Sequence, residues 1–453
     1  MKPVLFASLL FGLLNCALPA ALAGQAPETT TYPTVLPMQE RAKLQDTWLE
    51  TRLDTVVPAV MRERGIDMWI LIAREYNEDP VVKTMLPATW LSARRRTVLM
   101  FFDNGKTVER LAVSRYAVGH FFNAAWNPET DPDQWTRLAD LITARNPNKI
   151  ALNVSDTFAL ADGMTHSQHQ GIINALGPEL QQKIIYDPAL AIGWLERRIP
   201  AEMKRYPHIV GLAHAIIHEG FSSTVINPGV TTTADVMWWF REKIRQQRVT
   251  AWFHPTVSIQ RQTLDDKGQK MTELFDPSSD SVIRRGDLIH LDFGITYMGL
   301  NTDTQHHGYV LKVGETDAPA GLKNALKVGN RLQDILTSNF RTGLSGDMVL
   351  AASRKQAIAE GIEPSIYTHP IGYHGHGAGA TIGMWDQQGG VKGRGYYPVT
   401  SNAAWSIELS AMVPIAEWGG QKVRIMLEED AFFDGKSLTY IDGRQTELHI
   451  IGE

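Results

Sequence analysis

The sequence has almost no cysteine. Cys16 is the single cysteine among 453 residues, and it lies in an apolar N-terminal segment. If residues 1–23 are removed from the mature protein, no thiol remains. Disulfide bonds, a cysteine nucleophile and cysteine-ligated zinc are then excluded.

The N-terminal segment has the pattern of a secretory signal peptide. Lys2 precedes an apolar run from Val4 to Leu14, and small residues follow as far as Ala23. This run has about a dozen residues, fewer than the roughly 20 that span a bilayer. The pattern predicts cleavage after Ala23 and a periplasmic or secreted protein with no membrane anchor. Lipid attachment at Cys16 is the alternative, although Asn15 stands where lipoprotein signals have a small residue.

Long runs of one charge are also lacking. The chain has 44 Lys and Arg against 49 Asp and Glu, a net charge of −5, and no run of five like charges. A basic arm and an acidic tail are therefore excluded, and nucleic acid is not an expected partner. The length exceeds what one compact core usually holds and predicts two domains.

The first half of the chain is predicted to be an α/β domain. Residues 24–38 are rich in Thr and Pro and read as a tail. Residues 39–195 begin with a helical pattern that ends at Gly65, a C-cap signal. The apolar runs DMWILIA, TVLMFFD and KIALNVS then predict buried strands of a mixed sheet.

The second half, residues 200–453, is predicted to be a mainly antiparallel sheet backed by helices. Pro200 opens one long predicted helix, and Thr232 or Thr233 caps a second. Five strand-like runs follow, separated by Gly-rich and polar segments. The whole chain is therefore expected to be of the α/β (α+β) class.

Two aspartates flank a predicted hairpin in this second half. Asp292 ends an apolar run, and Asp303 follows eleven residues later, with a turn at Met298-Gly299 between them. A strand that folds back at this turn can bring both carboxylates together. Such a pair alone is more typical of a solvated hairpin rim.

The segment DLIHLDFG…YMGLNTD resembles the D-x-G…Y-x-G-Y-x-x-D segment of the pita-bread metallopeptidases. This family includes Xaa-Pro aminopeptidases, prolidases and methionine aminopeptidases, and its two Asp bind a pair of divalent metal ions together with one His and two Glu. The resemblance implies a metal site formed by Asp292, Asp303, His369 in HPIG, Glu408 in AWSIELSA and Glu428 in RIMLEED. Such an oxygen-rich site suits two divalent ions, with Mn²⁺ expected first and Co²⁺ or Zn²⁺ as alternatives.

A second alignment of the histidine motif is available. The run GHGAGATIG resembles the family's H-G-x-G-H-x-I-G but places Ala380 in the ligand position, which would break the site. With His369 as ligand, His376 falls seven residues on, where the family has its second catalytic His. We prefer this alignment, although Ser365 stands where the family often has another His.

The resemblance also implies catalytic roles. His254 and His376 are expected to contact the substrate, and Glu408 to take the proton of the attacking water. The sequence departs from the family at residues 268–284, which read as an insertion, and at Leu409, which replaces a usual Pro. Residues 377–400 are longer than typical and are expected to form a loop over the site.

Several polar and aromatic residues are expected to be structural. His290, His306, His307 and His374 are interpreted as ordinary structural histidines, and Trp238-Trp239-Phe240 as core. Glu429 and Asp430 are interpreted as solvated charges at a strand end.

The implied organisation is a creatinase-like N-terminal domain (39–195) followed by a pita-bread metallohydrolase domain (200–453). The implied function is an exported dinuclear-metal hydrolase of small peptides, of the Xaa-Pro aminopeptidase or dipeptidase type. Hydrolysis of a non-peptide C–N bond, or a non-catalytic binding role, are the alternatives. A small peptide is the expected partner; a homo-oligomer is left open.

Overall fold

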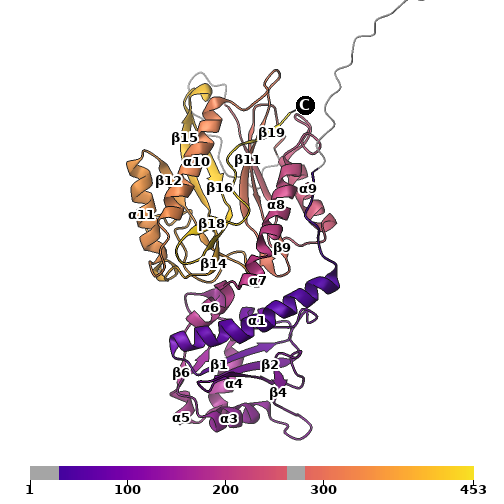
Figure 1. The fold of residues 1–453 in the computed structure, drawn as a ribbon, viewed down its shortest axis with the longest axis vertical. Coiled ribbons are helices and arrows are strands. Elements are labelled where there is room, and N and C mark those ends of the chain that lie inside the picture. The colour runs from indigo at the N-terminus through magenta and orange to yellow at the C-terminus, as the bar shows by residue number, and fades with distance from the viewer. Residues whose placement is uncertain (1–29, 263–280, 453) are drawn as a thin grey trace, which may run out of the picture. The chain divides into compact units, whose positions relative to one another are not determined.

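The computed structural model describes residues 30–262 and 281–452 (Figure 1). The predicted signal peptide and most of the predicted insertion at 268–284 lie outside the described residues. Within the described part, no helix is both long and apolar enough to cross a membrane. Tyr32–Glu453 pack as one compact unit, so the boundary near 195–200 stays a prediction.

The first helix is α1 (Met38–Arg64), as the periodicity predicts. Its C-cap Gly65 has φ 58°, a left-handed conformation that glycine adopts without a Cβ penalty. Its buried face includes Trp48, Val57 and Met61 and packs on α6 (Ala189–Glu196).

The N-terminal sheet is mixed, as predicted. Its strand order is β4-β3-β2-β1-β5-β6, with β1 antiparallel to β2 and parallel to β5. The strands are β1 (Met68–Arg74), β2 (Arg96–Asp103), β3 (Val108–Val113), β4 (Asn123–Ala124), β5 (Ile150–Leu152) and β6 (Ile184–Ile185). The accompanying helices are α2 (Pro80–Thr84), α3 (Gln134–Arg145), α4 (His166–Ala175) and α5 (Pro178–Gln181).

The long helix expected from Pro200 is broken in two. Helix α7 (Pro200–Met203) ends, and α8 (Tyr206–Gly220) begins, just before Pro207. Proline lacks the backbone N–H and disfavours a helical conformation of the preceding residue, so the helix restarts there. Helix α9 (Thr233–Gln246) is capped by Thr232, whose hydroxyl accepts from the backbone N–H of Asp235.

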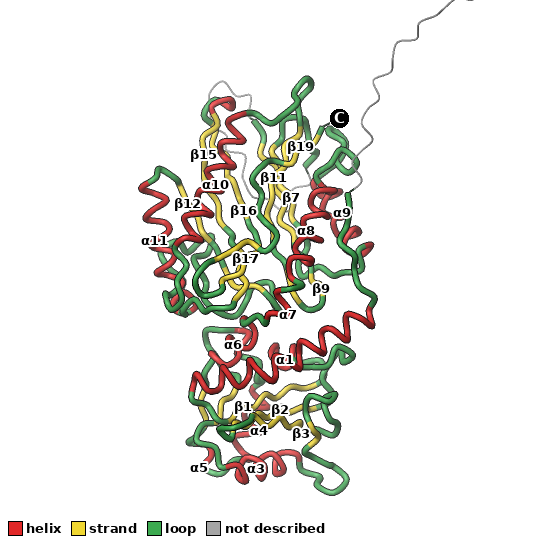
Figure 2. Tube along the Cα trace, viewed as in Figure 1, coloured by secondary structure: helices red, strands yellow, loops and turns green. Residues whose placement is uncertain are grey.

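The rest of the chain is mainly antiparallel, and Figure 2 shows its strands with helices beside them. In the described residues the sheet orders are β19-β11-β8-β7, β12-β15-β16 and β13-β14-β17-β18, with β9 and β10 forming a hairpin. Helix α10 packs on β15 and β16, α11 on β12, and α9 on β7. The elements are β7 (Thr256–Gln260), β8 (Leu288–Phe293), β9 (Thr296–Tyr297), β10 (Leu300–Asn301), β11 (Thr304–Val310), α10 (Ala320–Ser338), α11 (Gly346–Ala359), β12 (Glu363–Ile366), β13 (His369–Ile371), β14 (Ala403–Ser406), β15 (Leu409–Ile415), β16 (Gln421–Leu427), β17 (Asp430–Phe433), β18 (Leu438–Tyr440) and β19 (His449–Ile451).

Candidate metal centre

The predicted hairpin brings the two aspartates together. Met298 (φ 54°) and Gly299 (φ 80°) form a two-residue turn between β9 and β10, with both residues left-handed as such tight hairpins require. The chain then returns along β11, which pairs antiparallel with β8. Asp292 on β8 and Asp303 just before β11 consequently offer carboxylate oxygens within 4.8 Å of each other and of Glu428.

Strand pairing brings the remaining three candidates to the same place. Glu428 follows β16 and forms a backbone bridge with Gln305 of β11. His369 on β13 lies opposite Ser406 of β14, and the Ser406 hydroxyl donates to Glu428. Glu408, between β14 and β15, has a carboxylate oxygen within 4.8 Å of ligand atoms of His369 and Glu428.

His369 points one ring nitrogen at the carboxylates. Its Nε2 lies 3.9 Å from Asp303 Oδ2 and 3.7 Å from Glu428 Oε1. Its Nδ1 lies 3.0 Å from the carbonyl oxygen of Pro370, an acceptor that holds the proton on Nδ1. The lone pair of Nε2 is thereby aimed into the acidic cluster, the arrangement that metal-binding histidines usually have.

Three buried ligand atoms at this place have no hydrogen-bond partner among the described residues. They are Asp292 Oδ1, Asp303 Oδ1 and His369 Nε2. Unpartnered buried polar atoms are costly, and these three belong to residues whose ligand atoms cluster in overlapping groups here. A divalent cation fits this donor set.

The charges of these carboxylates also favour a bound cation. Burial, and then the charge of Glu428, raise the pKa of Asp292, Asp303 and Glu408 well above their ordinary values. Several carboxylates this close repel one another when ionised, and a cation between them removes that repulsion.

His376 lies beside this centre. Its ring centroid is 4.7 Å from that of His369, and it offers a nitrogen within 4.8 Å of ligand atoms of His369 and Asp303. Loss of hydration, and then the charge of His369, lower the pKa of His376 to about 4. The imidazole is therefore neutral at pH 7.

His254 is not brought to the centre by any contact among the described residues. Its exposed ring packs 5.1 Å from Trp238, and its Nδ1 lies 3.3 Å from Arg241. The neighbouring Trp252 is the residue of this segment that reaches the site, with its ring 5.3 Å from His376. The expected contact of His254 with the substrate stays a prediction.

Ala380, which occupies the ligand position in the second alignment, is 1% exposed and packs in the hydrophobic core. The geometry therefore favours the alignment with His369 as the ligand. Ser365 lines the cavity beside the centre.

The interpretation of Glu429 and Asp430 as solvated charges is wrong, because both are fully buried. Glu429 accepts hydrogen bonds from His306 at 2.8 Å and from His214 at 3.1 Å. Burial alone would raise the pKa of Glu429, but the charge of His306 and these bonds lower it to about 2. Asp430 accepts from the backbone N–H of Asp303. The partners come from α8 and β11, far away in the sequence, so the local pattern could not show them.

The hydrogen bond between His306 and Glu429 agrees with the interpretation of His306 as a structural histidine. The interpretation of Trp238-Trp239-Phe240 as core needs correction in part. In the aromatic cluster of α9 only Phe240 is core; Trp239 is half-buried, and Trp238 is 61% exposed.

A cavity of about 570 Å³ opens beside the carboxylates. Trp385, from the predicted loop at 377–400, forms part of its wall. Sequence reasoning missed Arg424, Met426 and Gln305, which also line it. Alternation along β16 is the signal that could have found the first two, because residues 424, 426 and 428 point to one face. The lining residues are His290, Asp292, Gln305, Ser365, Tyr367, Trp385, Glu408, Leu409, Ser410, Arg424 and Met426.

Comparison with known proteins agrees with this fold. The model of metallopeptidase family M24 matches residues 208–430. The structure of X-Pro aminopeptidase from Thermotoga maritima MSB8 superposes with a TM-score of 0.60 and 18% identity, over 87% of this chain and 100% of that one. Xaa-Pro dipeptidase from Bacillus anthracis gives 0.58 and 17%, over 92% and 100%.

One similar structure belongs to a subunit of a multiprotein complex. The N-terminal domain of the FACT complex subunit SPT16 from Cicer arietinum has a TM-score of 0.56 and 10% identity, over 90% of this chain and 99% of that one. Among curated proteins, a search by sequence finds no match.

The chain has the pita-bread fold of these structures, and its second half is similar to metallopeptidase family M24. The predicted fold class is thereby confirmed.

Proposed function

We propose that this protein is an exported, dinuclear metal-dependent hydrolase of small Xaa-Pro peptides. The observation that carries the proposal is the convergence of Asp292, Asp303, His369, Glu408 and Glu428, with three buried ligand atoms left without a partner. Two divalent ions, Mn²⁺ first and Co²⁺ or Zn²⁺ as alternatives, would be held there.

The chain's own residues suit peptide hydrolysis. Divalent ions in such a centre supply polarisation of a carbonyl group and activation of a water molecule. Glu408 is half-buried and faces the cavity, so it can accept a proton from that water. His376, neutral at pH 7, can donate a hydrogen bond to the substrate, or take over the proton that Glu408 accepts from the water and pass it to the leaving nitrogen.

The position of Arg424 supports dipeptides, rather than longer peptides, as the proposed substrates. This arginine lines the cavity and donates from Nε to the Ser410 hydroxyl at 3.0 Å. Among the described residues no acid forms an ion pair with it, and Glu408 is the charge that most raises its pKa against the lowering effect of burial. A guanidinium free to bind a planar oxyanion suits the terminal carboxylate of a dipeptide.

The test is metal analysis of the purified mature protein together with assays on Xaa-Pro dipeptides, Xaa-Pro amides and longer Xaa-Pro peptides. We expect about two ions per chain and hydrolysis of dipeptides, with Arg424→Gln raising KM for the dipeptide at least tenfold but not for its amide. Bound metal without hydrolysis of any peptide would favour a non-peptide C–N hydrolase. Absence of bound metal would favour a binding protein.

Export is a separate part of the proposal and rests on the sequence of residues 1–23. N-terminal sequencing of the exported protein should begin at Gly24. An intact Met1, or lipid on Cys16, would contradict it.

A further inference from the structure

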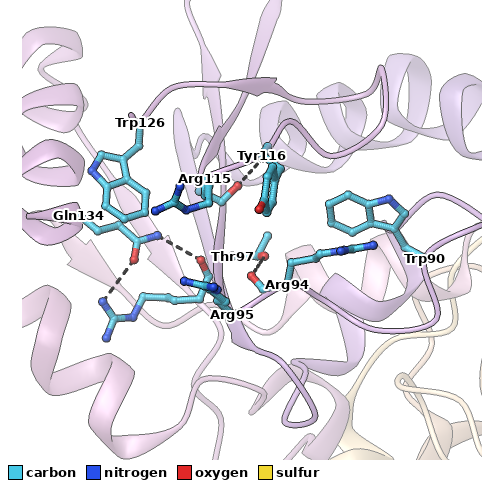
Figure 3. Close-up of a pocket in the computed structure, with 10 residues that line it drawn as sticks. Trp90, Arg94, Arg95, Thr97, Arg115, Tyr116, Trp126 and Gln134 are labelled. Atoms are coloured by element: carbon cyan, nitrogen blue, oxygen red, sulfur yellow. Dashed lines mark hydrogen bonds between the residues drawn. The ribbon is translucent and has the colours of Figure 1, made fainter. Parts of the chain in front are cut away.

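A second cavity, of about 210 Å³, lies in the N-terminal α/β part of the chain (Figure 3). It is lined by the loop before β2, the start of β2, the residues just after β3, Trp126 after β4 and the start of α3. None of the five metal-ligand candidates lines it, and it does not depend on the proposed function. Its lining residues are Trp90, Arg94, Arg95, Arg96, Thr97, Ser114, Arg115, Tyr116, Trp126 and Gln134.

Cationic side chains dominate this cavity. Four of its ten lining residues are arginines, and all of the others are uncharged. Among the described residues, Arg94, Arg95 and Arg96 have no ion pair with an acid, whereas Arg115 pairs with Glu129 at 2.8 Å. Burial, and then the charge of the neighbouring Arg74, lower the pKa of Arg96. The cavity is thus electropositive, and an anion would relieve the repulsion.

The nearby acids are held elsewhere. Glu78 accepts from the backbone N–H groups of Tyr76 and Ala93, and Glu75 from that of Arg95. Asp133 caps α3 by accepting from the backbone N–H of Trp135. These carboxylates accept from the surrounding backbone, and among the described residues none of them forms an ion pair with Arg94 or Arg95.

The side chains of Thr97, Ser114 and Gln134 in this cavity already have hydrogen-bond partners. The Thr97 hydroxyl donates to the carbonyl oxygen of Arg94, and the Ser114 hydroxyl to that of Tyr116. The Gln134 amide donates to the carbonyl oxygens of Arg96 and Val113. Arg96 donates to Gln168 and Gln134, so the guanidinium groups of Arg94 and Arg95 are the ones available to a ligand.

The backbone holds these arginines in place. Arg95 has φ 50°, a left-handed conformation that is uncommon for a residue with a side chain. Its carbonyl oxygen accepts from the backbone N–H of Glu75 at 2.7 Å, which fixes this turn. Arg94 lies over the ring of Trp90, with 5.3 Å between its guanidinium carbon and the ring centroid.

We propose that this cavity binds an oxyanion of a small molecule, a phosphate or a carboxylate group, through Arg94 and Arg95, with Arg115 at its edge. A guanidinium fork can donate two parallel hydrogen bonds to two oxygens of either oxyanion. The volume is below the roughly 300 Å³ at which pockets for drug-sized ligands begin, so the ligand is a small anion or the anionic end of a larger molecule.

The experiment is calorimetric titration of the full mature protein with inorganic phosphate and, separately, with succinate, in buffer free of both and at constant ionic strength. We expect saturable one-to-one binding of at least one probe, and the stronger probe identifies the source of the oxyanion. Arg94→Gln with Arg95→Gln should weaken it at least tenfold. The matched double variant Arg331→Gln with Arg341→Gln removes two exposed positive charges from the α10 region and should leave affinity within twofold.

A titration of Asp303→Ala separates this site from the proposed metal centre, because both probes also bind divalent ions. Binding that survives in Asp303→Ala and is lost in the Arg94 and Arg95 variant supports the proposal. Absence of binding by either probe at 10 mM, on the order of the weakest specific affinities, would overturn it. Equal weakening in both double arginine variants, or loss of binding in Asp303→Ala alone, would also overturn it.

Discussion

Gln305 and Glu428 are joined by both backbone and side chain. The backbone N–H of each donates to the carbonyl oxygen of the other, at 3.0 and 3.3 Å, and the Gln305 Nε2 donates to Glu428 Oε2 at 2.6 Å. The same nitrogen lies 3.0 Å from Glu408 Oε1, and the Gln305 oxygen lies 2.9 Å from the Nε2 of His290. One amide therefore orients two of the proposed metal ligands.

Gln305→Ala should lower the affinity for the metal about 10- to 100-fold, because groups that orient metal ligands typically contribute that much. Titration of the metal-free protein with Mn²⁺ measures the change. Gln333→Ala removes another buried glutamine, one that bonds Asn330 on α10, and should leave the affinity unaltered. Equal affinities for all three proteins would mean that Gln305 has no such role.

Asp303→Ala should reduce bound metal and abolish peptidase activity. The substitution removes a ligand, and a preformed centre short of one ligand binds its ions more weakly. Metal content by mass spectrometry, with activity before and after chelation and re-addition of Mn²⁺, measures both effects. Asp140→Ala, on the exposed face of α3, is the control. Full metal content and full activity in Asp303→Ala would place the centre elsewhere.

Substitutions of the neighbouring histidines His369 and His376 should separate metal binding from turnover. His369→Ala should lose metal, whereas His376→Ala should keep it and lower kcat about 10²- to 10⁴-fold, the usual contribution of a general acid or base. Metal content and kcat of both variants distinguish the alternatives. A silent His369→Ala, with fewer than two ions in the wild type, would instead support the alignment that puts Ala380 in the ligand position.

Glu196 should make folding stability fall as the pH rises. It is 4% exposed, and burial raises its pKa to about 8, against the lowering effects of a bond from Gly379 and the charge of Arg198. A carboxyl whose pKa is raised by folding stabilises the protein while protonated in both states. That contribution is lost between pH 4.5 and pH 8, and amounts to at most about 5 kcal/mol.

Glu196→Gln keeps an acceptor for the Gly379 N–H without a charge, so its stability should exceed that of the wild type at pH 9 and match it at pH 4.5. Urea unfolding at both pH values tests this, with exposed Glu447→Gln as the control. A constant difference between wild type and Glu196→Gln at the two pH values would contradict the assignment.

Local patterns predicted the elements of this fold well. The helical repeat ending at Gly65, the cap at Thr232 and the alternating apolar runs depend on residues close together in the chain, where spacing alone decides the outcome. The exception is the break between α7 and α8, where Pro207 interrupts an apolar periodicity that otherwise predicts one helix.

The sequence by itself determined which five residues are the candidate metal ligands, four carboxylates and one histidine, and their order along the chain. Only the tertiary structure decided their surroundings: Gln305 between two glutamates, Arg424 in the cavity, and the burial of Glu429 against His214 and His306. The contacts of Gln305 with Glu408 and Glu428, and those of Glu429 with His214 and His306, join residues more than a hundred positions apart. They follow from strand pairing and helix packing, which no local spacing encodes, because burial and charge depend on which distant segments close over a side chain.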